Sequence, residues 1–173
     1  PYFIEKIIDV KGRKIKQSFS ITNEETPRII DPRNAFIMTS LLKEVINTGT
    51  ARKAKRLKRE DIAGKTGTTN ELVDAWFAGF TPDVVTITWM GFDQPKSLGK
   101  HESGSRAALP IWIDYMKPII DEYPTKIVET PEGIIPLRIN PKNGMLANKN
   151  EDNIYEYFYD EFPPSDNAYF LLN

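Results

Sequence analysis

The chain has 173 residues, of which 40% are hydrophobic and 27% charged, and its formal net charge is -1. This length and composition suit one folded domain with a hydrophobic core, and the balanced charge favours no class of charged partner. The chain contains no cysteine, which excludes a disulfide framework, a thiolate nucleophile and a cysteine zinc site. No run of about 18 apolar residues is present, so no transmembrane helix is expected.

Residues 1–19 are predicted to form a β-hairpin. Apolar, β-favouring residues at 2–4 and 7–8 precede a turn, and Lys14-Ile15-Lys16 returns beside them. The turn, Asp9-Val10-Lys11-Gly12, ends in a glycine that adopts the positive φ such turns commonly need.

A helix is predicted next. Asp31 is a good N-cap, Pro32 suits the first helical position, and Gly49 is placed to end the helix in a left-handed conformation. The i, i+3, i+4, i+7 spacing of one buried face is shown by Met38, Leu41, Leu42 and Val45. By the same helical wheel, Ser40 belongs on the solvent face.

Three strands joined by short turns are predicted at residues 62–69, 73–80 and 84–92, after a basic loop or short helix at 52–61. Six of the eight residues from Arg52 to Arg59 are basic. In the third strand, apolar residues alternate with threonines, as in an antiparallel strand with one buried face: Val85, Ile87 and Trp89 against Thr86 and Thr88.

Beyond a loop at 94–104, a second helix is predicted to start near Leu109 and to stop before Pro118, because an internal proline kinks or ends a helix. Its apolar stripe is Leu109, Trp112, Ile113, Met116 and Ile120. An edge strand at 134–139 contains Pro136, which cannot donate to a ladder, and a turn follows at 140–144. The acidic, aromatic tail either docks on the domain or is mobile.

The stretch Lys65-Thr66-Gly67-Thr68 carries the chemistry. Side chains at i and i+2 share a face of a strand, so we expect the lysine and the two threonine hydroxyls to point the same way and hold a carboxylate. Gly67 lets a ligand approach the backbone, whose N–H groups can stabilise an oxyanion.

The surroundings of this motif resemble class A penicillin-binding proteins, with segments in the order found in that family. Residues 64–70 and the Asp74-Ala75-Trp76-Phe77-Ala78-Gly79-Phe80-Thr81-Pro82 segment carry the resemblance. Gly91-Phe92-Asp93-Gln94-Pro95 and the Arg106–Trp112 segment look most like the 1A type. The resemblance covers residues 1–117 well and the remainder loosely.

This resemblance implies a site completed by K-T-G, with a serine nucleophile in S-x-x-K and a proton-transfer S-x-N motif. Lys65 would hydrogen-bond the S-x-N serine and supply positive potential. Thr66 and Thr68 would bind the carboxylate of a D-Ala-D-Ala stem peptide or of a β-lactam, and the Thr68 N–H would form half of the oxyanion hole. Gly67 keeps the strand open, and Thr69 completes the set of substrate-binding residues.

Three lookalikes of the missing motifs are rejected. Ser40 and Ser97 begin S-x-x-K patterns and Ser165 an S-x-N pattern, but the family places both motifs upstream of K-T-G, and only 25 positions separate Ser40 from Lys65. The chain begins at Pro1 without an initiator methionine or a signal-peptide layout. We therefore expect a piece of a longer protein whose nucleophile lies upstream, and we expect this piece alone to be inactive.

Other notable residues have simpler interpretations. The run at 52–59 lacks interleaved aromatic residues and a nucleic-acid-binding motif, so a solvated loop is favoured over nucleic-acid binding. Asp74 is interpreted as a polar residue that fixes strand geometry, and Trp76, Trp89 and Trp112 as core. His101, the only histidine, has no partners for a metal.

The predicted fold class is α+β, an antiparallel sheet with flanking helices, of the penicillin-binding protein and serine β-lactamase type, represented by its C-terminal portion. Residues 1–123 would be the C-terminal half of a transpeptidase domain and 124–173 an extension. The implied activity is cross-linking of peptidoglycan stem peptides through a serine acyl-enzyme, with no metal and no cofactor. Two alternatives stay open: a D,D-carboxypeptidase or β-lactamase type of hydrolase, and a non-catalytic binding module.

The resemblance also implies a parent protein anchored in the bacterial inner membrane, with its transpeptidase at the periplasmic face. Its partners would be stem peptides and β-lactams, not nucleic acid. Because a partial sheet exposes apolar surface and strand edges, self-association of the chain is expected.

Overall fold

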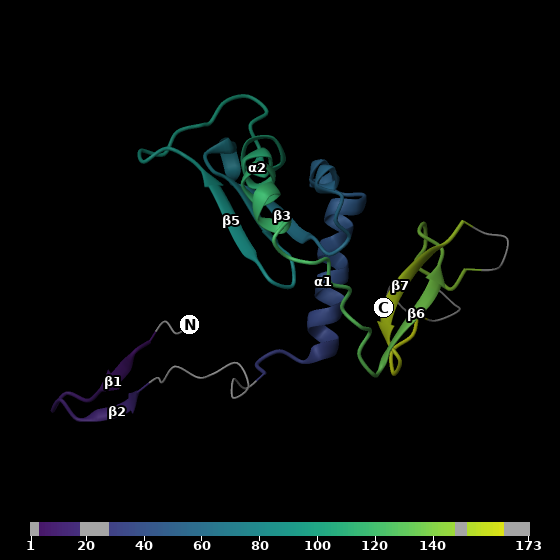
Figure 1. Cartoon of the computed structure of the whole chain (residues 1–173), viewed down its shortest axis with the longest axis horizontal. Coiled ribbons are helices and arrows are strands. Elements are labelled where there is room, and N and C mark those ends of the chain that lie inside the picture. The colour runs from purple at the N-terminus through teal and green to yellow at the C-terminus, as the bar shows by residue number, and fades with distance from the viewer. Residues whose placement is uncertain (1–3, 18–27, 148–151, 165–173) are drawn as a thin grey trace, which may run out of the picture. The chain divides into compact units, whose positions relative to one another are not determined.

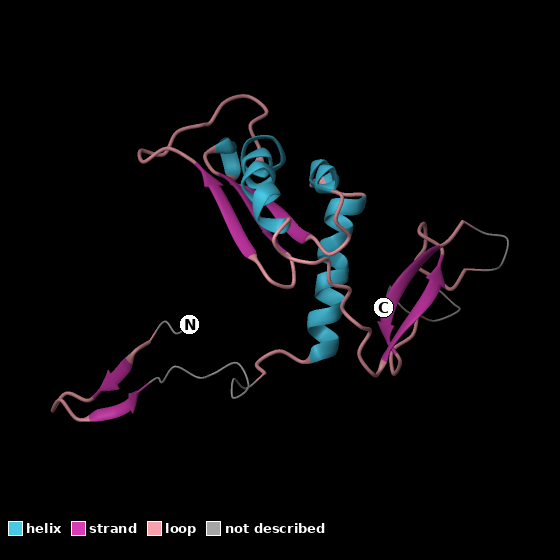
Figure 2. Cartoon of the chain, viewed as in Figure 1, coloured by secondary structure: helices cyan, strands magenta, loops and turns pink. Residues whose placement is uncertain are grey.

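The computed structural model describes residues 4–17, 28–147 and 152–164. The chain divides by its contacts into two compact units, Pro1–Asp31 and Pro32–Asn173. Their helices and strands are drawn in Figures 1 and 2. The separate division into a transpeptidase part, 1–123, and an extension, 124–173, stays a prediction. Within the described ranges, no helix is both long and apolar enough to cross a bilayer.

The first unit contains the predicted hairpin. Strand β1 (Lys6–Ile8) pairs antiparallel with β2 (Lys14–Gln17). The turn between them is closed by the Asp9 carboxylate, which accepts a hydrogen bond from the backbone N–H of Arg13 at 2.8 Å. Gly12 has a φ of +76° there, which glycine adopts without steric cost. The hairpin prediction is confirmed for the described residues, and positions 1–3 and 18–19 lie outside them.

The second unit is built around a three-stranded antiparallel meander, as predicted. Its order is β3 (Ala63–Thr68), β4 (Ala75–Phe80) and β5 (Val85–Met90). Short connections enforce this order, and the N–H of Thr81 closes the β4–β5 turn on the carbonyl of Val84 at 2.8 Å. Strand β3 is therefore an edge of the sheet.

Helix α2 (Leu109–Ile120) covers one face of this sheet (Figure 1). The Trp112 ring packs edge-on against Phe77 with centroids 5.0 Å apart, and its indole N–H donates to the Thr86 carbonyl at 3.1 Å. The Thr86 hydroxyl contacts the Met116 sulfur at 3.2 Å. The threonine side of β5 thus meets the helix.

The predicted burial of the apolar face of β5 is therefore wrong. Val85 and Ile87 are 75% and 62% exposed. The cause is the register: Phe77 lies opposite Thr88 on β5, and residues opposite each other share a face. Because fully buried Phe77 faces α2, Thr88 faces α2 as well.

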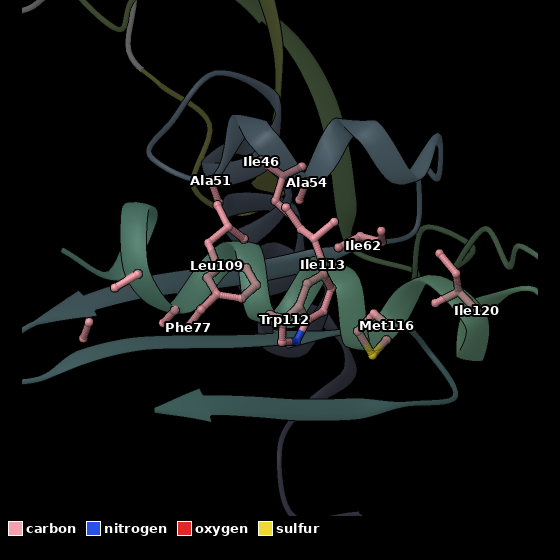
Figure 3. Close-up of a cluster of buried hydrophobic side chains, with 13 residues drawn as sticks. Ile46, Ala51, Ala54, Ile62, Phe77, Leu109, Trp112, Ile113, Met116 and Ile120 are labelled. Atoms are coloured by element: carbon pink, nitrogen blue, oxygen red, sulfur yellow. The ribbon is translucent and has the colours of Figure 1, made fainter. Parts of the chain in front are cut away.

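Apolar side chains from α2, from the sheet, from the end of α1 (Pro32–Asn47) and from the segment after it form one buried cluster (Figure 3). All five members of the predicted α2 stripe are buried, including Trp112, as expected. The helix continues through Pro118 to Ile120, so the predicted stop before the proline is wrong; buried Ile120 holds the last turn in the core. Trp76 and Trp89 are 41% and 46% exposed, so their placement in the core was also wrong.

Helix α1 begins and ends close to the predicted positions, but its buried face differs. Met38 and Leu41 are about half exposed, at 52% and 51%, and the buried residue is Ile46. Ser40 is half-buried, so its placement on the solvent face was wrong. The helix enters the core only through its C-terminal part, where Val45 and Ile46 meet the cluster of buried side chains.

Gly49 follows α1 without adopting a left-handed conformation, contrary to prediction. A Cβ built on it would lie 2.8 Å from both the Cα and the carbonyl oxygen of Val45. Glycine is required here for close approach of the backbone, not for positive φ. The chain then forms the short 3-10 helix Arg52–Leu57, which confirms the basic loop or short helix expected at 52–61.

The C-terminal strands β6 (Ile134–Ile139) and β7 (Ile154–Tyr159) form a separate two-stranded sheet. The predicted edge strand with Pro136 is therefore confirmed. Tyr157 of β7 packs edge-on against Phe36 of α1 with ring centroids 4.9 Å apart. This part of the aromatic tail docks on the second unit, while residues 165–173 lie outside the described part.

Candidate substrate-binding site at the KTGT strand

The Lys65–Thr68 motif lies in β3, at the edge of the three-stranded sheet (Figure 1). Strand β4 pairs with one side of β3, and no strand of the described chain pairs with the other. In an antiparallel edge strand, alternate N–H groups point away from the paired neighbour. The Lys65 and Thr68 side chains are exposed, and Thr66 and Gly67 are half-buried. The strand therefore presents backbone donors and side chains together.

The lysine and the two threonines do not share a face, so that expectation was wrong. Lys65 and Thr66 are consecutive in a regular strand, and consecutive side chains point to opposite faces. Thr66 and Thr68 lie on the face of Phe77, because Thr66 is opposite Phe77 in the register. Lys65 lies on the opposite face, with Trp76 and Ala78. The two hydroxyls therefore lie on one face of this edge strand, and the ammonium lies on the other.

Each threonine on the hydroxyl face contacts a loop from elsewhere in the chain. The Thr66 hydroxyl lies 2.7 Å from that of Thr50, in the turn that follows α1. The Thr68 hydroxyl accepts a hydrogen bond from the backbone N–H of Gly104 at 3.0 Å. These contacts orient the threonines and bring residues near 50 and 104 to the strand.

Gly104 packs closely against the motif. A Cβ built on it would lie 2.4 Å from the Trp76 carbonyl oxygen and 2.5 Å from the Gly67 carbonyl oxygen. Atoms cannot come so close without a shift, so this position requires glycine. A Cβ on Gly67 would lie 3.2 Å from the Cβ of Trp76. The bare backbone at 67 therefore faces the tryptophan.

Thr69 and Asp74 close the end of the strand. The Thr69 hydroxyl accepts the backbone N–H of Asp74 at 2.8 Å, and the Asp74 carboxylate accepts the indole N–H of Trp89 at 2.9 Å. Asp74 thus links the connection between β3 and β4 to β5. This is the geometric role expected of Asp74.

Lys65 carries the positive charge of the site. Its ammonium donates to the carbonyl of Thr66 at 2.9 Å, and no carboxylate of the described residues forms an ion pair with it. An exposed ammonium without a carboxylate partner is available to an anionic ligand. Among the described residues, no three histidine, cysteine, aspartate or glutamate side chains gather to hold a metal ion.

The rejected serines have no hydrogen bond to this motif among the described residues. Ser97 is exposed and its hydroxyl accepts the N–H of Gly99 at 3.3 Å. No hydrogen bond in the described part of the chain joins Ser40 or Ser97 to residues 65–69. Ser165 lies outside the described residues.

Thr50 and Gly104 are the site residues that sequence reasoning missed. Thr50 lies in a turn, and Gly104 begins the short π-helix Gly104–Ala108 that leads into α2; neither segment has a strong sequence pattern. The small residues at 103–105, directly before a helix, were the available sign that a backbone approaches closely there.

Comparisons with known proteins identify the family of this chain. The penicillin-binding protein transpeptidase domain family matches residues 1–117, which is more than half of the chain. The chain therefore belongs to the penicillin-binding protein transpeptidase domain family, with its antiparallel sheet and flanking helices, as the sequence indicated.

Particular relatives are penicillin-binding proteins 1A. The chain is 47% identical to that of Pseudomonas aeruginosa over 162 residues, covering 91% of this chain and 20% of the relative. It is 46% identical to that of Aquifex aeolicus over 149 residues, covering 86% and 20%. The crystal structure of penicillin-binding protein 1A from Haemophilus influenzae superposes with a TM-score of 0.75 at 32% identity, covering 95% of this chain and 30% of that one. The chain thus spans about a fifth of the length of these curated relatives.

Proposed function

We propose that this chain supplies the substrate strand of a serine-type peptidoglycan D,D-transpeptidase. The observation that carries this proposal is the edge strand 65–68, which offers an exposed ammonium, two hydroxyls and backbone N–H groups. This combination suits a peptide with a C-terminal carboxylate next to a reactive carbonyl. A family match over residues 1–117 supports the assignment of the strand to this reaction.

In the proposed site, each residue of the motif has a role. Lys65 supplies positive potential and hydrogen-bonds the serine of an S-x-N motif. Thr66 and Thr68 bind the substrate carboxylate, and the Thr68 N–H supports the oxyanion. Gly67 keeps the strand accessible, and Thr69 lines its end. The loops of Thr50 and Gly104 hold the two hydroxyls in place.

The proposed reaction has two steps. A serine oxygen bonds to the carbonyl carbon of the D-Ala-D-Ala bond, the C–N bond breaks, and D-alanine leaves with the proton on its amine. The amine of a neighbouring stem peptide then attacks the ester, and the serine hydroxyl is restored. The parent protein would act at the periplasmic face of the inner membrane, where β-lactams would acylate the same serine.

Labelled penicillin tests where the nucleophile lies. We expect no covalent adduct with this chain alone, because neither Ser40 nor Ser97 is hydrogen-bonded to the KTGT strand in the described structure. A stable adduct mapped by mass spectrometry to either serine would overturn this part of the proposal.

Binding of N-acetyl-D-Ala-D-Ala, followed by NMR, tests the strand itself. We expect Lys65→Gln and Thr68→Val to weaken binding about fivefold or more each, since each loses a hydrogen bond to a charged group. Lys117→Gln and Thr125→Val are matched controls, because both side chains are exposed and lie outside β3. Equal effects in the two sets of variants would contradict the proposed roles.

A further inference from the structure

A basic hollow lies beside the KTGT strand, and its charged residues have no part in the roles above. It has a volume of about 520 Å³ and is shallow and open. Its lining comes from two segments, the turn and 3-10 helix after α1 and the end of the loop with the π-helix (Gly104–Ala108) before α2. The polar residues that line it are Thr50, Arg52, Lys53, Glu102, Ser105 and Arg106.

The charges of this hollow are unbalanced. Arg52, Lys53 and Arg106 contribute three positive charges and Glu102 one negative charge, so the lining carries a formal charge of +2 (three minus one). All three cations are exposed, and none forms an ion pair or side-chain hydrogen bond within the described ranges. Arg59, a few residues further on, is by contrast neutralised by Asp61 at 2.7 Å.

Cations that converge on one hollow repel each other, and an anion bound between them relieves that repulsion. Two hydroxyl groups, of Thr50 and Ser105, are available there as further donors. The single carboxylate of Glu102 lowers the net charge to a value that suits one or two carboxylate groups. The composition of the hollow therefore favours a small anion with hydrogen-bond acceptors.

Each of the two segments that line the hollow also contacts the KTGT strand. Thr50 lines the hollow, and its hydroxyl lies 2.7 Å from that of Thr66. Ser105 and Arg106 directly follow Gly104, whose N–H donates to the Thr68 hydroxyl at 3.0 Å. A peptide whose C-terminal carboxylate is held by Thr66 and Thr68 would have its next groups near these two loops.

We propose that this hollow is a second anion subsite, which takes a side-chain or α-carboxylate of a stem peptide other than its C-terminal carboxylate. The proposal rests on the proposed function of the KTGT strand. It adds a preference for peptides that carry an internal negative charge. The residues that confer this preference are Arg52, Lys53 and Arg106.

Two peptides that differ by one charge test the subsite on the full chain. The pentapeptide Ala-γ-D-Glu-Lys-D-Ala-D-Ala has a free α-carboxylate on its γ-linked glutamate, and its D-isoglutamine counterpart carries an amide there. We expect the charged peptide to bind about fivefold more tightly at low salt, which is on the order of one well-placed ion pair. Affinity is measured by NMR titration of the backbone amides.

Matched variants locate the effect. The triple variant Arg52→Gln, Lys53→Gln, Arg106→Gln removes the three cations and should erase the difference between the peptides. The control Lys55→Gln, Arg56→Gln, Lys58→Gln removes the same charge from exposed residues of the same basic run that do not line the hollow, and the difference should persist. All six side chains are exposed, so neither triple variant alters the core. The comparison of the two peptides on the unaltered chain tests the subsite without any variant.

Several outcomes would overturn the subsite. Equal affinity of the unaltered chain for the two peptides would do so, as would an equal loss of preference in the control variant. If neither peptide binds, the proposed role of the KTGT strand in this chain fails instead, and inorganic phosphate then tests the hollow alone. If phosphate shifts the amide signals of residues 50, 53 and 105, the hollow binds anions, but its assignment to peptide carboxylates is overturned. If phosphate causes no such shifts, the hollow is not an anion site.

Discussion

The Arg59 guanidinium and the Asp61 carboxylate form a buried ion pair with two hydrogen bonds, of 2.8 and 2.7 Å. Their side chains are 9% and 2% exposed. Arg59 also donates to the carbonyls of Ile120 and Tyr123 at 2.8 and 2.7 Å, at the end of α2. The pair thus joins the segment that leads into β3 to the end of the helix that covers the sheet.

Asp61→Ala should destabilise the chain strongly, because it leaves the Arg59 charge buried without its partner. Loss of one member of a buried, hydrogen-bonded pair costs about 3 to 5 kcal/mol. Urea unfolding followed by circular dichroism measures this change. Lys142→Ala is the control, since its pair with Asp152 is 4.0 Å long and more than four-fifths exposed on both sides. A loss as small as that of the control would mean that Arg59 finds another partner.

Stability should also depend on pH through Asp61. Burial acts to raise the pKa of this carboxyl and is the largest single influence, but the hydrogen bonds from Arg59 and the Lys126 backbone N–H and the Arg59 charge all lower it, and the pKa lies below the ordinary 3.8. A lowered folded-state pKa means that the contribution is fully present above about pH 4 to 5 and is lost as pH falls through the folded value. The free energy of unfolding should therefore fall below about pH 4, and Asp61→Asn should make that fall shallower. Parallel pH profiles for the two proteins would contradict this origin.

Gly104→Ala should disturb the KTGT strand. The added Cβ would meet the backbone oxygens of Trp76 and Gly67 at 2.4 and 2.5 Å, and the backbone has to move. Overpacking of this kind costs about 1 to 3 kcal/mol. Shifted amide signals in β3, together with the loss of stability, are the measurement. Ser103→Ala, at the residue directly before the π-helix Gly104–Ala108, should leave those signals in place.

Trp89→Phe should weaken the closure of the β3–β4 connection. It removes the indole N–H that donates to Asp74 at 2.9 Å, a hydrogen bond to a charged group that contributes on the order of 1 to 2 kcal/mol. Trp76→Phe is the matched comparison, because Trp76 lies opposite Trp89 in the register, is similarly exposed and has no hydrogen bond through its indole in the described structure. Thermal unfolding of the two variants should rank Trp89→Phe as the less stable.

Ile87→Lys should reduce self-association. One face of the sheet exposes apolar side chains, namely Val85, Ile87, Trp76 and Trp89. An apolar patch of this kind favours contact with a second copy of the chain. We expect sedimentation velocity at high concentration to show association for the unaltered chain and a monomer for the variant. A clean monomer for both would remove the expectation of self-association.

Local sequence signals predicted most of the elements. Gly12, Pro32 and the α2 stripe have their effects within a few residues, so their spacing alone indicates the hairpin turn, a helix start and a second helix. The K-T-G triplet and its flanking segments likewise identified the family without any knowledge of contacts. Predictions failed where the answer depended on packing between elements, as in β5, whose covered face follows from its pairing with β4, and at Pro118, where burial of Ile120 in the core holds the last turn of the helix.

The sequence by itself determined the strands, the approximate positions of the helices and the KTGT motif, because alternation, helical periodicity and turn residues are local properties. Only the tertiary structure decided which face of each element is covered. Alternation in β5 distinguishes two faces, but the pairing of Thr88 with Phe77 and the position of α2 select the threonine face. In the same way, the loops of Thr50 and Gly104 reach the KTGT strand only because the fold brings positions 16 and 36 residues apart together.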